Sequence, residues 1–172
     1  MLVSDPTTFR WKGFDTIELE RPNLGSQTTV ATYQIMQYAM RSVLNEHFGN
    51  ETVKKLFYEA GELAGQELCK NALDISRDFY GFLSQLQDVL RELKIGILRI
   101  EKSDVKKMKF MFVVAEDLDC SGISSSEDTV SDYEEGFIAG IMNIYTNKEF
   151  SVKEIDCWTT GNRVCRFEVT LR

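Results

Sequence analysis

Histidine is the scarcest functional residue type in this 172-residue sequence, with His47 as its only example. One histidine leaves little basis for Ser–His or Cys–His catalysis, or for a metal centre built from several imidazoles. The sequence also lacks a phosphate-binding glycine loop, a nucleophile elbow and a dinucleotide fingerprint. These absences argue against the common nucleotide-dependent and hydrolytic enzymes.

Long apolar runs and excess positive charge are missing as well. The longest apolar stretches, FMFVVA and FIAGIM, are far shorter than the roughly 20 residues that cross a bilayer. The first 20 residues have no basic start, apolar run and small-residue cleavage site, so we expect a cytoplasmic protein. A formal charge of −7 would repel phosphate backbones, which disfavours a nucleic-acid partner.

The hydrophobic pattern that is present predicts one domain spanning residues 1–172, with residues 1–25 as an extended segment packed on it. Apolar residues recur at helical spacing over about 26–49, 50–70, 76–94 and 133–145. Strand patterns cover about 96–100 and 108–116, then 149–158 and 164–171. We therefore predict an α+β fold, in which about four helices cover an antiparallel sheet of two hairpins plus an N-terminal strand.

The last hairpin carries the most informative residues, Glu154, Cys157 and Cys165. A turn at Thr160, Gly161 and Asn162 makes Cys157 and Cys165 face each other, close enough to share a zinc ion. Glu154 is an odd number of residues from Cys157 and would point the other way, unless a β-bulge between Val152 and Cys157 shifts the phase. The alternative is that both cysteines are small core residues, sharing a face with Ile155, Phe167 and Val169.

Two glycine pairs, Gly61 with Gly65 and Gly136 with Gly140, lie one turn apart on predicted helices. Either another element packs tightly there, or the glycines leave room for a ligand between helices and sheet. The residues that would line such a pocket are Phe57, Gly61, Phe110, Phe112, Tyr133 and Phe137.

Two other groups are weaker candidates. His47 is expected on the apolar stripe of the first long helix, which also contains Met36, Met40 and Val43, as a core histidine or a helix-dipole contact instead of a heme ligand. Glu116, Asp117 and Asp119 follow a strand but lack the spacing of a calcium loop. We expect them to form a solvated loop.

The motifs EDLDCSG, YEEGFIAGI and VKEIDCWTTGNRVCRFEV, with RPNLG and LFYEAGELAGQEL before them, resemble the 4-vinyl-reductase-like small-molecule-binding domain family. The resemblance implies a fold like that of nitric-oxide-signalling and Golgi-transport ligand-binding domains. It also implies binding more than chemistry.

In zinc-containing members of that family a carboxylate and three cysteines hold the metal. The resemblance assigns this glutamate to Glu154 and the last two cysteines to Cys157 and Cys165, whereas the first cysteine position is occupied by Ser131. Because a serine hydroxyl is a poor zinc ligand, Cys120 is the candidate fourth ligand if its loop folds back.

The function favoured by the sequence is binding of a small lipophilic or aromatic molecule, with a regulatory output through a homodimer or a partner signalling protein. An accessory protein or reductase acting on a tetrapyrrole is one alternative, and a dimerisation scaffold without ligand is another.

Overall fold

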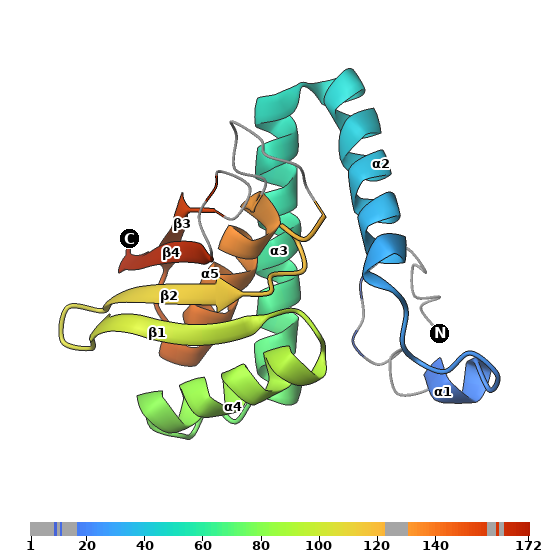
Figure 1. The fold of residues 1–172 in the computed structure, drawn as a ribbon. Coiled ribbons are helices and arrows are strands. Elements are labelled where there is room, and N and C mark those ends of the chain that lie inside the picture. Colours follow the sequence, from blue (N-terminus) through green and yellow to red (C-terminus); the bar gives the residue numbers. More distant parts are fainter. Residues whose placement is uncertain (1–8, 10, 12–16, 123–130, 158–160, 162–163) are drawn as a thin grey trace, which may run out of the picture.

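The computed structural model describes residues 9, 11, 17–122, 131–157, 161 and 164–172. The elements follow one another as α1 (Ile17–Glu20), α2 (Val30–Phe48), α3 (Asn50–Ala72), α4 (Phe79–Glu92), β1 (Ile97–Asp104), β2 (Lys109–Ala115), α5 (Asp132–Thr146), β3 (Phe150–Asp156) and β4 (Cys165–Leu171). The predicted α+β class is confirmed, and the four long helices coincide with the four predicted from periodicity (Figure 1).

The four strands form one antiparallel sheet in the order β1-β2-β4-β3, so the two hairpins join through β2 and β4. Phe112 lies opposite Phe167 at this junction. The predicted N-terminal strand is wrong for the described residues, because Ile17–Glu20 form the helical turn α1 and no described strand precedes β1. Its acidic residues, Glu18 and Glu20, suit the first turn of a helix. Most of residues 1–16 and most of the predicted turn at Thr160–Asn162 lie outside the described residues.

Local capping chemistry sets the ends of the long helices. The Thr29 side chain accepts a hydrogen bond from the Thr32 amide at the start of α2. Gly49, with φ of 78°, ends α2 and lets the chain reverse into α3. Of the two candidate caps for α4, Asp78 is the one used, since its carboxylate accepts from the Gly81 amide at 2.8 Å. The helix consequently starts at Phe79, three residues later than predicted.

Helix α5 lies between the sheet and α3, and nine consecutive residues of it, from Glu134 to Met142, are buried. The glycine pairs explain how α3 comes so near. A Cβ at Gly61 would overlap the backbone carbonyl of Tyr133, and one at Gly136 would overlap that of Tyr58. The glycines therefore make a tight helix–helix contact, which was one of the two alternatives, and leave no room for a ligand there.

Helix α2 stands apart from the sheet and forms the outer arm of a hairpin with α3 (Figure 1). Met36, Met40 and Val43, predicted to face the core, are more than half exposed, at 59%, 51% and 53%. His47 is exposed as well, in the last turn of α2, so it is not a core histidine. Periodicity identifies an apolar face, but the residues that cover it must come from elsewhere, and here the opposite face of α2 meets the protein.

Candidate functional site

The β3–β4 hairpin contains the predicted bulge. Glu154 pairs with Phe167 and Asp156 pairs with Arg166, so β3 gains one residue between them. Ile155 is that extra residue and is 51% exposed, whereas the sequence predicted it on the core face. The shift turns the side chains of Glu154 and Cys157 to the same buried side of the sheet.

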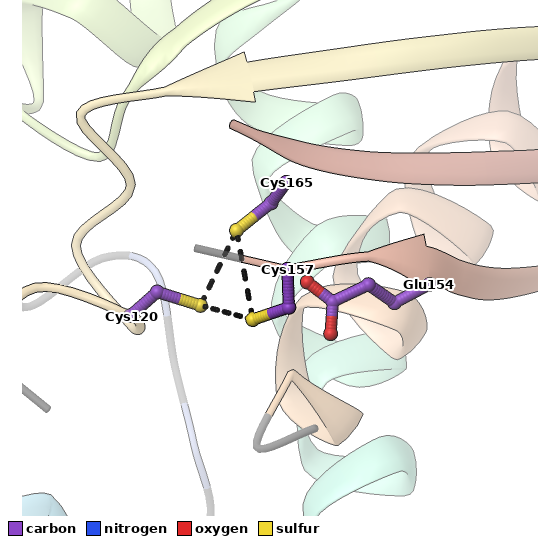
Figure 2. A group of neighbouring side chains, drawn as sticks. All are labelled: Cys120, Glu154, Cys157 and Cys165. Carbon is purple, nitrogen blue, oxygen red and sulfur yellow. Dashed lines mark hydrogen bonds between the residues drawn. The ribbon is translucent and has the colours of Figure 1, made fainter. Parts of the chain in front are cut away.

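Cys120 completes the cluster from the loop that follows β2. Its sulfur lies 3.4 Å from that of Cys157 and 3.3 Å from that of Cys165, and the latter two sulfurs are 3.9 Å apart. Figure 2 shows the three sulfurs forming a triangle, with the Glu154 carboxylate beside Cys157. All four ligand atoms lie within 4.8 Å of one another, and all four residues are buried.

This spacing suits a tetrahedral metal ion. Thiolates at about 2.3 Å from zinc lie about 3.8 Å apart in a regular tetrahedron, near the observed sulfur distances of 3.3–3.9 Å. Ser131, at the position of the family's first cysteine, is fully buried, with its hydroxyl 3.4 Å from the Cys120 sulfur. Cys120 thus occupies the space that a cysteine at position 131 would reach.

The electrostatics of the cluster also favour a cation. Neither carboxylate oxygen of Glu154 has a hydrogen-bond partner of good geometry within the described residues. Burial, with the Cys157 thiol next to it, raises the pKa of Glu154 to about 9. The hydrogen bond with Cys157 and then burial raise the pKa of the Cys120 thiol. A divalent cation would offset the cost of ionising these buried groups.

A second polar cluster lies on the other side of Cys120. Asp117 and Asp119, predicted to be solvated, are each only 6% exposed because their loop folds back beneath α2. Tyr33 of α2 donates a hydrogen bond to the Asp119 carboxylate at 2.5 Å, and Tyr38 donates to the Asp119 carbonyl at 3.1 Å. Gln34 also donates to this loop, at the carbonyl of Leu118.

A cavity of about 120 Å³ opens beside this loop, between α2 and α5. Tyr33, Ile95, Tyr133 and Phe137 supply rings and apolar surface, while Asp117, Asp119 and Glu134 supply carboxyl groups. A smaller cavity of about 20 Å³, lined in part by Phe112, Phe137 and Glu134, adjoins it towards the sheet.

The predicted pocket residues separate into two groups. Tyr133 and Phe137 line the larger cavity, and Phe112 and Phe137 line the smaller one. Phe110, only 1% exposed, is a core residue stacked on Phe79, and Phe57 lies under the guanidinium of Arg41. Sequence reasoning missed Tyr33, Asp117, Asp119 and Glu134. The acidic residues in the otherwise apolar YEEGFIAGI segment were the available signal.

The second hairpin and the cavity wall match a known family. The family model of the vinyl-4-reductase domain matches residues 110–171, which include the four clustered ligands and most of the cavity wall. Residues 110–171 form a vinyl-4-reductase domain. This confirms the resemblance to the 4-vinyl-reductase-like family, although the family model matches a shorter segment than the quoted motifs span.

Relatives extend the similarity beyond the vinyl-4-reductase domain. An uncharacterized protein of Methanocaldococcus jannaschii is 28% identical over 148 residues, which cover 86% of this chain and 81% of the relative. A vinyl-4-reductase family protein from the same species has a similar fold, with a TM-score of 0.62, 16% identity and coverage of 94% and 93%.

Two further solved structures share this fold. The phenol-responsive sensory domain of the transcription activator PoxR, bound to phenol, gives a TM-score of 0.65 at 17% identity, covering 84% of this chain and 75% of that one. A trafficking protein particle complex subunit 3 from Naegleria fowleri, covalently bound to palmitic acid, gives 0.66 at 11% identity, covering 83% and 95%. Among the described residues, no helix combines the length and apolar character of a membrane span.

Proposed function

We propose that this vinyl-4-reductase-domain protein binds and senses a small, largely apolar molecule in the cavity between α2 and α5. The observation that carries the proposal is the cavity itself, about 120 Å³ with three aromatic walls and buried polar groups. Concave, mainly apolar sites with a few convergent polar groups are typical of small-molecule binding. The shared fold of a phenol-responsive sensory domain supports the proposal.

The cavity is also well situated for signalling. Its walls come from α2, from the loop that carries Cys120 and from α5, and Tyr33 touches both the cavity and Asp119. A ligand that prefers one arrangement of these elements would shift α2 relative to the rest of the domain. The movable part is thus the arm that stands apart from the sheet.

A second copy of the chain is the proposed receiver of that shift. Met36, Met40 and Val43 form one exposed stripe on α2, facing away from the hydrogen bonds of Tyr33, Gln34 and Tyr38. Spacings of four and three residues suit the seam of a helix pair. Self-association through this stripe would bury apolar surface and report the position of α2.

Zinc is the proposed cofactor, held by Cys120, Glu154, Cys157 and Cys165. Four protein ligands fill a tetrahedral shell and leave no open position for a substrate, so the metal would be structural. It would fasten the Cys120 loop to the β3–β4 hairpin and thereby hold one wall of the cavity.

Native mass spectrometry of protein purified without chelator tests this function. A copurifying small molecule that is lost on denaturation, together with one zinc per chain, is the expected result. The matched control is Phe137→Trp, which fills the cavity from its own wall and should abolish the small-molecule adduct while keeping the zinc. An adduct that persists in this variant would mean that the molecule binds elsewhere. Protein isolated without any adduct, and without a shift in melting temperature across a library of small aromatic and aliphatic compounds, would refute the sensing function.

A further inference from the structure

The acidic side of the cavity is more specific than an apolar pocket requires. Asp117, Asp119 and Glu134 are 6%, 6% and 5% exposed, and none of the ion pairs found among the described residues includes them. Buried carboxyl groups are costly unless they are paired or hydrogen-bonded. Three in one cavity wall call for a compensating partner.

Part of that demand is met within the protein. Asp119 accepts from Tyr33, and one oxygen of Asp117 accepts from the Asp119 amide at 2.9 Å. The second oxygen of Asp117 and Oε2 of Glu134 are buried with no hydrogen-bond partner in the described residues. Both residues line the cavity. Two acceptors therefore remain for N–H or O–H donors of a bound molecule.

The partner is larger than a bare metal ion. Among the described residues, the Cys120 cluster is the one group of three or more histidine, cysteine or carboxylate side chains whose ligand atoms come within 4.8 Å of one another. The three acidic groups of the cavity do not converge to that degree, so a single metal ion is a poor match. An ion with its own carbon skeleton can reach the carboxyl groups and fill the apolar part of the cavity as well.

The remaining walls suit such an ion. Tyr133 and Phe137 lie with their rings stacked, centroids 6.4 Å apart, and Tyr33 contributes a third ring. Aromatic faces attract ammonium ions, and the attraction grows when the site is desolvated. Burial, with Asp117 beside it, raises the pKa of Glu134, as expected for a carboxyl group that awaits a cation.

We propose that this cavity selects a compact organic ammonium ion, whose N–H groups donate to Asp117 and Glu134 while its carbon chain lies against Ile95, Tyr133 and Phe137. The inference rests on the proposed sensing function and names its ligand class. An apolar cavity of about 150 Å³ takes up benzene, which has six heavy atoms. The cavity of about 120 Å³ should accept an amine of about that size or slightly smaller.

The test compares n-butylammonium with 1-butanol, which has the same carbon chain and no positive charge. Binding is measured on the full-length, zinc-loaded protein by calorimetry at physiological salt. NMR contacts from the butyl protons to the rings of Tyr133 and Phe137 locate the site. We expect n-butylammonium to bind at least about tenfold more tightly than 1-butanol, since hydrogen bonds to charged groups are about twice as strong as neutral ones.

Isosteric variants separate this site from general attraction to an acidic protein. Glu134→Gln and Asp117→Asn should each weaken n-butylammonium binding by about tenfold or more. Glu116→Gln is the matched control, because it removes the same charge from the neighbouring exposed residue and should leave binding unchanged. Circular dichroism of each variant establishes that it is folded, and the two cavity variants test the same site independently.

Each outcome has a definite meaning. If 1-butanol contacts Phe137 and binds as tightly as n-butylammonium, the ammonium inference is overturned and the sensing function stands. Equal losses in Glu116→Gln and Glu134→Gln, or no ammonium binding at all, overturn the inference too. If neither probe binds and no small molecule copurifies, the sensing function falls with it.

Discussion

Removing zinc should reverse the way in which the stability of this vinyl-4-reductase-domain protein depends on pH. In the metal-free fold the pKa of Glu154 is raised to about 9, against about 4.3 in an unfolded chain. The folded state therefore holds one proton more than the unfolded state between those two values. Its free energy of unfolding is highest at the acidic end of that window and falls as pH rises towards about 9.

The magnitude follows from one proton. Each pH unit changes the free energy of unfolding by about 1.4 kcal/mol, so Glu154 alone lowers it by about 2.7 kcal/mol between about pH 6 and about pH 8. Glu134, whose pKa is also raised by burial, acts in the same direction. Asp119, with a pKa of about 6, contributes mainly below that value.

With zinc bound, the sign is opposite. Cys120, Cys157 and Cys165 would stand as thiolates in the fold, whereas unfolded cysteines keep their protons up to about pH 8.5. The unfolded chain then binds more protons, and the free energy of unfolding rises by about 1.4 kcal/mol per pH unit for each thiol.

The assay is urea unfolding, followed by far-UV circular dichroism at three pH values between about 6 and 8, at a fixed free zinc concentration and again with chelator. Glu154→Gln is the control: its metal-free form should lose the Glu154 contribution to the pH slope, and it should bind zinc more weakly. If the chelated wild-type protein gains stability as pH rises, or if both forms have the same slope, the assignment of these residues to a zinc site is refuted.

Three further variants test separate features. Cys120→Ser should lower the zinc content below one equivalent, and Cys120→Ser with Ser131→Cys should restore it because the two side chains meet at 3.4 Å; full zinc in the single variant would show that Cys120 is not a ligand. Gly61→Ala should destabilise the fold by about 3 kcal/mol, because the added Cβ overlaps the Tyr133 carbonyl, whereas helix propensity alone predicts a gain of about 1 kcal/mol; the exposed neighbour Ala60→Gly, costing about 1 kcal/mol, calibrates the propensity scale in this helix. Met36→Glu with Met40→Glu should convert a dimer to a monomer in analytical ultracentrifugation, whereas Ser42→Glu, also exposed on α2, should not; a wild-type protein that is monomeric throughout would exclude association through α2.

The β3–β4 hairpin shows how far sequence reasoning can reach. The change of apolar parity between Val152 and Cys157 predicted a bulge, and the bulge is present at Ile155. That success has a physical basis, since alternation along a strand is local and a break in it leaves a trace in the sequence. The choice of Ile155 as a core residue failed because parity alone does not say which residue is the extra one.

Other features depend on contacts that no local pattern encodes. The stripe of Met36, Met40 and Val43 has helical spacing whether it faces a core or solvent. Asp117 and Asp119 look like solvated loop residues until Tyr33 and Tyr38, more than 80 residues earlier in the chain, hydrogen-bond to that loop. The same folding back brings Cys120 to Cys165, 45 residues later.

Cys120 is separated from Asp119 by one peptide bond, and this short stretch of loop belongs to both the metal cluster and the cavity. Occupancy of one site must then be felt at the other. By thermodynamic reciprocity, whatever factor a cavity ligand applies to the affinity for zinc, zinc applies to the affinity for that ligand. A metal that only holds a wall in position would in this way also set the concentration at which the wall responds.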